Sequence, residues 1–171
     1  LSQVSSLKNP NGYLAVFHIP KQEQKILSDW ILVLDGVQDP GNLGTIIRLC
    51  DWFGVVDIIC SPQTVDCYNP KVLQATMGSI SRVHIRYTEL KAFLSFSELP
   101  IYGAFMDGVS VNDLKLPEKG ILIMGNEGKG ISDSVAQLCT EKLAIPQFGG
   151  ITTESLNVAS ATAILLHEIR K

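Results

Sequence analysis

Hydrophobic residues along this chain gather in short blocks that predict β-strands alternating with helices. Strands are expected at residues 31–37, 55–60, 83–87, 101–106, 121–125 and 143–145. Apolar strands without polar alternation are typical of a sheet buried on both faces. Helices are expected at residues 43–53, 69–78, 88–96, 132–139 and 155–171. Strands that alternate with helices in this way predict an α/β fold, with a mostly parallel sheet and helices on both faces.

The segments outside this pattern are short. Residues 13–20 look like an edge strand that ends at a proline, followed by a short polar helix or loop. Residues 107–119 are hydrophilic and are expected to form a loop. Asn42 and Ser132 are expected to cap the helices that follow them, because their short polar side chains accept bonds from free backbone N–H groups.

Composition limits the class of protein. The chain has 171 residues, enough for one domain with a proper core. Its mean hydropathy of +0.20 is high, but the longest apolar runs are too short to span a membrane. The first residues show no secretory signal, and the missing initiator Met suggests that further residues precede Leu1.

Charge and cysteine usage add two constraints. The net charge of −3 argues against a broad nucleic-acid surface, although a local patch or a further basic domain is compatible with it. No CxxC pair occurs, and the three histidines are scattered, so no metal site is expected. We therefore expect reduced thiols in a cytoplasmic protein. The cysteines are Cys50, Cys60, Cys67 and Cys139.

Gly-rich loops with polar side chains follow three of the expected strands. They lie within residues 34–48, 123–132 and 145–157. Such loops meet at the carboxyl edge of an open α/β sheet and form a ligand crevice there. Their polar residues have the chemistry to hold RNA or a nucleotide-like cofactor: Asn42, Arg48, Glu127, Ser155 and Asn157.

Several common sites are absent. The sequence GNEGKGIS at residues 125–132 superficially resembles a phosphate loop, but two residues separate its first Gly from Gly-Lys where the Walker pattern needs four. No strand leads into a GxGxxG fingerprint, and no GxSxG elbow occurs. These absences disfavour a nucleotide triphosphatase, a dinucleotide enzyme and a serine hydrolase.

Each polar residue also has an ordinary structural interpretation. Arg48 could be a surface arginine, and Glu127 a solvated loop acid. Ser155 and Asn157 could cap the last helix. Each signal is weak alone, and it is the convergence of three loops on one crevice that favours a site.

Three segments in order resemble the three motifs of the SpoU/TrmH class of SPOUT RNA methyltransferases. They are NLGTIIR at residues 42–48, GNEGKGIS at 125–132 and IP…SLNVASATAI at 145–164, within a catalytic domain at residues 30–171. The resemblance implies a C-terminal deep trefoil knot and a homodimer with each active site near the subunit interface. It also implies S-adenosylmethionine as cofactor and methyl transfer to a ribose 2′-hydroxyl of tRNA or rRNA.

The resemblance also implies roles for individual residues of this chain. Arg48 and Asn42 would act on the RNA, while Glu127, Ser155 and Asn157 would complete the catalytic set. We expect Arg48 to grip a phosphate and polarise the hydroxyl, because a guanidinium pKa above about 12 disfavours a role as base. The residues expected to bind or flank the cofactor are Gly103, Ala104, Phe105, Gly125, Gly128, Ile145, Leu156 and Asn157.

Departures from the family pattern concern the detailed shape of the cofactor loop, not the class of enzyme. Gln147 stands where family members usually have Met, and the loop after it is longer than usual. Residues 1–29 are expected to follow an RNA-binding domain outside this chain. The alternatives are a catalytically silent SPOUT-like RNA- or cofactor-binding module, a SPOUT enzyme that methylates a base atom, and an unrelated nucleotide-binding domain. The target RNA and the general base stay open.

Overall fold

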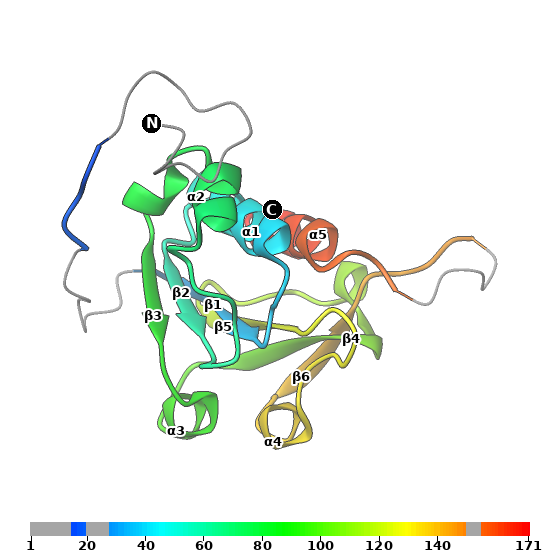
Figure 1. The fold of residues 1–171 in the computed structure, drawn as a ribbon. Helices are drawn as coiled ribbons and strands as arrows, with labels where there is room; N and C mark the ends of the chain where they lie inside the picture. The colour runs from blue at the N-terminus through cyan, green and yellow to red at the C-terminus, as the bar shows by residue number, and fades with distance from the viewer. Residues whose placement is uncertain (1–14, 20–27, 150–154) are drawn as a thin grey trace.

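A six-stranded sheet forms the centre of the protein in a computed structural model that describes residues 15–19, 28–149 and 155–171. The strand order is β3-β2-β1-β5-β4-β6, and each pairing of neighbours is parallel (Figure 1). The α/β fold expected from the sequence is confirmed. The strands are β1 (Trp30–Asp35), β2 (Asp57–Cys60), β3 (His84–Tyr87), β4 (Ile101–Ser110), β5 (Gly120–Gly125) and β6 (Glu141–Ala144).

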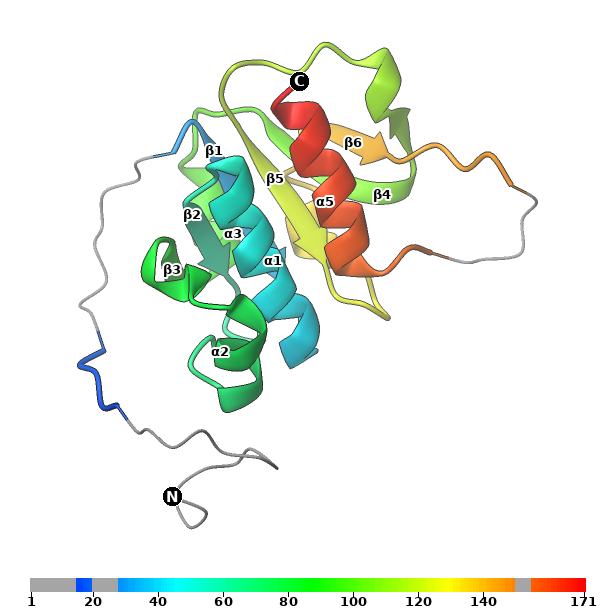
Figure 2. The same cartoon turned by 90° about the horizontal axis from the view of Figure 1, so that it is seen from above.

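Helices cover both faces of this sheet. Figure 1 shows α1 (Pro40–Phe53), α2 (Pro70–Thr76) and α5 (Val158–Ile169) on one face. The opposite face carries α3 (Leu90–Ser95) and α4 (Asp133–Ala136) (Figure 1). Figure 2 shows α1 and α5 side by side across the sheet. Two short 3₁₀ helices complete the described elements: η1 (Ser79–Ser81) and η2 (Val111–Asp113).

The central strands are apolar throughout because each face has its own core. In β1, Trp30, Leu32 and Leu34 belong to the core beneath α1, α2 and α5. Ile31 and Val33 alternate with them and pack into the core beneath α3 and α4. Full burial of a large aliphatic side chain contributes roughly 1.5–3 kcal/mol, so both sets stabilise the sheet.

Helix α1 packs closely against its neighbours. A Cβ at Gly44 would meet the side chain of Ala75, which shows how near α2 approaches. Gly54 ends α1 in the left-handed region, with φ of 68°. The Arg170 guanidinium then donates to the Phe53 and Gly54 carbonyl oxygens at 2.8 and 2.9 Å. The end of α5 thus satisfies carbonyl groups that α1 leaves free.

Strand β4 is longer than expected. It runs to Ser110 and enters the segment 107–119 that was expected to be a loop. The strand has no continuous apolar pattern there because its ladder is interrupted: Ala104 and Val109 both lie opposite Leu143 on β6. The residues between them leave the regular pairing, so sequence alternation could not reveal them.

Other boundaries also differ. Helix α4 spans one turn rather than residues 132–139. Residues 15–19 of the expected edge strand are exposed and form no strand, and the rest of residues 13–27 lies outside the described part. No helix among the described residues is long and apolar enough to span a bilayer.

Candidate active site

The strand order reverses between β1 and β5, which lie side by side at the centre of the sheet. From β1 the chain builds outward to β2 and β3, whereas β4 and β6 lie beyond β5 on the other side. The loops that leave β1 and β5 therefore meet at the carboxyl edge of the sheet. Ligands of open α/β sheets bind at such a reversal.

Asn126 shapes the loop after β5. Its Nδ2 donates to the Gly36 carbonyl at 2.7 Å, and its Oδ1 accepts from the backbone N–H groups of Gly128 and Lys129, both at 3.0 Å. Its backbone exchanges two hydrogen bonds of 2.9 Å with Gly130. Asn126 was not among the residues expected in the site, but its bonds fix a tight hairpin and join it to the loop after β1.

Gly125, the last residue of β5, must be a glycine. A Cβ there would overlap the backbone of Gly130 and Ile131. The hairpin therefore folds directly against the strand end, and no side chain fits between them.

The Glu127 carboxylate connects the hairpin to the loop after β1 and to α1. Oε2 accepts from the Gln38 N–H at 3.2 Å, and Oε1 accepts from the Asp39 N–H and from Asn42 Nδ2, both at 3.1 Å. Partial burial raises the pKa of this carboxyl, but the hydrogen bonds from Asn42 and from backbone N–H groups outweigh it and hold the pKa below its usual range. Glu127 is therefore ionised at neutral pH.

Asn157 brings the third segment into the same network. Its Nδ2 donates to Asn42 Oδ1 at 2.9 Å, and its Oδ1 accepts from the N–H groups of Ala159 and Ser160 as the cap of α5. The carboxylate at one end and the helix N–H groups at the other fix both amide orientations. The chain Glu127–Asn42–Asn157 thus joins all three sequence segments.

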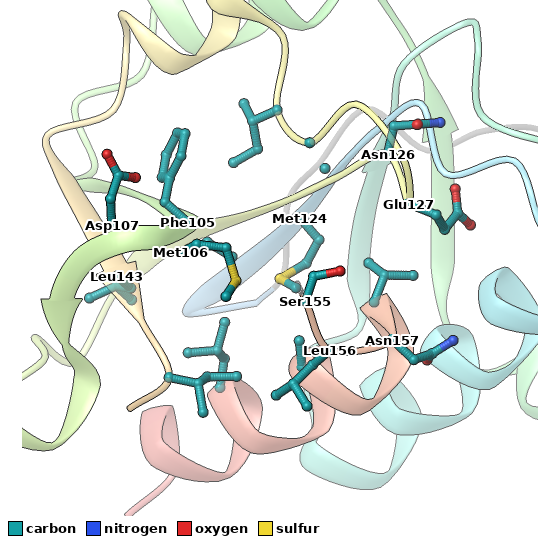
Figure 3. Close-up of a pocket in the computed structure, with 18 of the residues that line it drawn as sticks. Phe105, Met106, Asp107, Met124, Asn126, Glu127, Leu143, Ser155, Leu156 and Asn157 are labelled. Carbon is teal, nitrogen blue, oxygen red and sulfur yellow. The ribbon is translucent and has the colours of Figure 1, made fainter. Parts of the chain in front are cut away.

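This network borders a cavity of about 950 Å³ between the β4 and β5 ends and the start of α5. Figure 3 shows Ser155 and Leu156 beside Met124, with Met106 and Leu143 at the other end from Asn157. Most residues expected in the site line the cavity. They are Ala104, Phe105, Gly125, Glu127, Gly128, Ile145, Ser155, Leu156 and Asn157.

Three residues that were expected in the site do not line the cavity: Gly103, Asn42 and Arg48. Gly103 does not line the cavity, because the Phe105 ring and the Cys139 sulfur fill the space beside its Cα. Asn42 is outside the cavity wall and does not cap α1; Asp39 does, and its carboxylate accepts the Asn42 N–H at 2.7 Å. Asn42 is placed one turn further in, where its amide reaches Glu127 and Asn157.

Arg48 does not line the cavity either. It lies six residues beyond Asn42 on α1, which places it about 9 Å along the helix and about 120° around it. Its side chain is exposed and has no hydrogen bond or ion pair within the described residues. The structure therefore brings Asn42, Glu127 and Asn157 together and leaves Arg48 apart from them.

Sequence reasoning missed several wall residues. Met106 and Asp107 follow Phe105 on the interrupted stretch of β4, where consecutive side chains reach the cavity. Lys142 on β6 lies 3.6 Å from the Asp107 carboxylate and 4.7 Å from the Phe105 ring centre. Met124 precedes Gly125 and also contributes to the wall. An apolar strand end carries no signal that distinguishes wall from core.

The cavity suits an organic ligand. Its size lies at the upper end of the range for small-molecule pockets, and its wall combines apolar side chains with backbone groups of strand ends. Among the described residues, no three His, Cys, Asp or Glu side chains are placed to hold a metal ion.

Comparison with known proteins agrees with this geometry. The chain is 34% identical to the 23S rRNA (guanosine(2553)-2′-O)-methyltransferase RlmP of Bacillus subtilis, over 99% of this chain and 68% of the relative. It is also 34% identical to the 23S rRNA (guanosine-2′-O-)-methyltransferase RlmB of Neisseria meningitidis, over 82% of this chain and 58% of that protein.

Solved structures give the same result. A Porphyromonas gingivalis protein assigned to the TrmH family of RNA methyltransferases superposes with a TM-score of 0.90 at 42% identity, over 99% of this chain and 70% of that one. An AdoMet-bound rRNA methyltransferase from Sinorhizobium meliloti gives 0.75 at 34% identity, over 82% and 55%. Residues 29–167 match the SpoU rRNA Methylase family. The chain therefore belongs to the SpoU rRNA Methylase family.

Proposed function

We propose that this chain transfers a methyl group from S-adenosylmethionine to a ribose 2′-hydroxyl of ribosomal or transfer RNA. The observation that carries the proposal is the hydrogen-bonded chain Glu127–Asn42–Asn157. It joins three segments far apart in sequence at the edge of one cavity. Relatives named as 2′-O-methyltransferases of 23S rRNA support the reaction.

The cavity residues fit S-adenosylmethionine. S-adenosylmethionine would supply a methyl group bound to a positively charged sulfonium, and this charge is lost when the methyl group is transferred. Backbone groups at Gly125, Ile145 and Leu156 would hold its polar atoms, while Met124 and Leu143 supply apolar contact. Gly128 adds no side chain to the wall, so the backbone of the hairpin is accessible to the ligand.

The protein contributes mainly alignment. Glu127 is ionised and accepts three hydrogen bonds. We therefore assign it to fixing the positions of the hairpin, the loop after β1 and α1 relative to one another. The hydrogen bond between Asn42 and Asn157 fixes the start of α5 to the same network. Ser155 is exposed and lines the cavity, and we assign its hydroxyl to contact with the reacting ribose. Holding the two reactants in one geometry supplies much of the rate enhancement in such a transfer.

Arg48 is assigned to the RNA. Its exposed, unpaired guanidinium suits a bidentate grip on a phosphate, and it polarises the ribose hydroxyl. Because Arg48 lies about two helical turns from Asn42, RNA reaches both only across the outer surface of α1 or with Arg48 supplied by a second copy.

We also propose that the protein forms a homodimer. We propose that it is located in the cytoplasm. The outward face of α1 carries Trp52 with 83% exposure, four residues from Arg48, and the neighbouring α5 exposes Ile164. An aromatic residue with an arginine is typical of the centre of an interface. Trp52→Glu is expected to convert the dimer to monomer in light scattering. A wild-type chain that is monomeric at all concentrations would reject this part.

A C-terminal trefoil knot is the remaining structural proposal. Strand β6 ends at one edge of the sheet, whereas α5 lies beside α1 near its middle (Figure 2). Its test is to join the chain ends enzymatically in the native state and then unfold the ring. A knotted ring migrates faster in a denaturing gel than the same chain joined while unfolded, and equal mobility would exclude a knot.

Cofactor binding and methyl transfer test the function. Calorimetry with S-adenosylhomocysteine, ATP and NAD is expected to show binding of the first alone. Labelled S-adenosylmethionine is expected to methylate unmodified 23S rRNA transcript or tRNA, and the product bond is expected to resist alkaline cleavage because its 2′-oxygen is blocked.

The outcomes separate the alternatives. Cofactor binding without transfer to any RNA would indicate a silent binding module. Transfer to a position that stays alkali-sensitive would indicate base methylation. Binding of ATP or NAD instead would indicate an unrelated nucleotide-binding domain.

A further inference from the structure

The cavity wall carries three charged side chains, and they differ in what neutralises them. Glu127 is held by three hydrogen bonds. Asp107 has the Lys142 ammonium 3.6 Å away. Lys129 is exposed, and its ammonium has no hydrogen bond or ion pair within the described residues. Among the described wall residues, Lys129 alone is cationic, and its charge is free.

The position of Lys129 is fixed although its side chain is free. Its backbone N–H donates to Asn126 Oδ1 at 3.0 Å, within the hairpin that Asn126 and Gly130 close. It lies two residues from Glu127, a separation of at most about 7 Å between Cα atoms. The hairpin therefore presents a cation on a flexible side chain at the wall of the cavity, two residues from the Glu127 carboxylate of the network that joins the three segments.

We propose that Lys129 binds the phosphate next to the ribose that is methylated, which makes it a positioning residue for the RNA. This inference rests on the proposed function. The 2′-hydroxyl sits on the carbon beside the one that carries the 3′-phosphate, so a nucleotide that places this hydroxyl in the cavity brings a phosphate to its edge. A lysine is a compact point charge on a flexible stem and tolerates variation in where that phosphate lies.

The charge of the whole chain makes a local cation important. A net charge of −3 repels RNA, so attraction depends on a few exposed cations near the site. Each phosphate neutralised on a single strand lowers the logarithm of affinity by about 0.7 per tenfold rise in salt. One contact therefore raises the affinity about fivefold at about 0.1 M salt, relative to about 1 M salt, where its contribution vanishes.

Salt titration of RNA binding provides the test. The probe is a fluorescein-labelled single-stranded RNA from 23S rRNA, added to the chain saturated with S-adenosylhomocysteine. Lys129→Ala is expected to weaken binding about fivefold at about 0.1 M salt and to reduce the salt slope by about 0.7. Lys129→Arg is expected to keep the wild-type slope. The matched control is Lys91→Ala, an exposed lysine on α3 at the opposite face of the sheet.

Two further readouts separate this role from others. The KM for RNA is expected to rise while kcat and the affinity for S-adenosylhomocysteine stay unchanged. An equal loss of S-adenosylhomocysteine affinity would assign Lys129 to the cofactor carboxylate and overturn the proposal. A salt slope equal to that of wild type, or an equal change in Lys91→Ala, would also overturn it. A wild-type chain that neither binds RNA nor transfers a methyl group would reject the proposed function itself.

Discussion

Replacing Glu127 with glutamine tests the network at the cavity edge. Glutamine keeps the length of the side chain but carries one acceptor oxygen and a donor NH₂ group in place of two acceptors. In the native structure, one carboxylate oxygen faces the Gln38 N–H, and the other faces the Asp39 N–H and the Asn42 amide. Whichever way the glutamine turns, its NH₂ group faces at least one donor, so at least one hydrogen bond is lost.

The expected cost follows from this count. A hydrogen bond contributes about 0.5–1.5 kcal/mol to stability, and one to a charged group somewhat more. Glu127 is largely exposed, so we take the low end of that range. Loss of one bond and weakening of the two others cost about 1 kcal/mol of unfolding free energy, or about 2–4 °C in Tm for a chain of this length.

The cost depends on pH with a definite sign. The folded-state pKa of Glu127 lies below the unfolded value of about 4.3, so its carboxylate stabilises the fold above that pH. This contribution is lost as pH falls through the folded-state pKa. Urea unfolding is therefore expected to separate wild type from Glu127→Gln at neutral pH, and the gap is expected to close in acid, where the wild-type carboxyl is also neutral.

The matched control is Glu118→Gln. Glu118 is exposed, on the segment before β5, and has no interaction within the described residues. Equal stability of Glu127→Gln and this control at neutral pH would refute a stabilising role for the Glu127 hydrogen bonds. A gap that persists unchanged in acid would show that shape, not charge, causes the cost.

Two glycine substitutions and one thiol-labelling experiment test other parts of the structure. Gly125→Ala places a Cβ in the backbone of the hairpin, so calorimetry is expected to show at least a tenfold loss of S-adenosylhomocysteine affinity; wild-type affinity would contradict the close approach. Gly44→Ala puts a Cβ 2.8 Å from the Val72 carbonyl and is expected to cost about 1–2 kcal/mol in urea unfolding, since overpacking outweighs the better helix propensity. Burial raises the pKa of the Cys50 and Cys60 thiols, so both are expected to resist iodoacetamide at about pH 8 until the chain unfolds; labelling of the native protein would refute this.

The sequence predicted the sheet because the strands leave an unbroken apolar pattern. β1 and β5 have buried side chains on both faces, and such strands are bounded clearly by turn residues. The interrupted part of β4 has no such pattern, so only the structure could show that it extends to Ser110.

Part of the site could not be predicted for a different reason. Asn42 is a residue type that is preferred at helix N-caps, so the local sequence predicts that it caps α1. Its side chain instead bonds Glu127 and Asn157, which are 85 and 115 residues away in sequence. Contacts over such separations leave no local pattern, and the resemblance to a family placed these residues together without stating how they bond.

The interruption of β4 has a consequence for how this protein can diverge. Leu143 pairs with Ala104 before it and with Val109 after it, so the sheet closes around the excluded residues. Residues can be added or removed between these two positions without shifting a ladder partner on either side. The residues from Phe105 to Asp107, which shape one wall of the cavity, are thus open to change over evolution while the strands beside them keep the pairing that holds the fold; Gly108 is not, because a Cβ there would meet the Lys142 and Leu143 backbone.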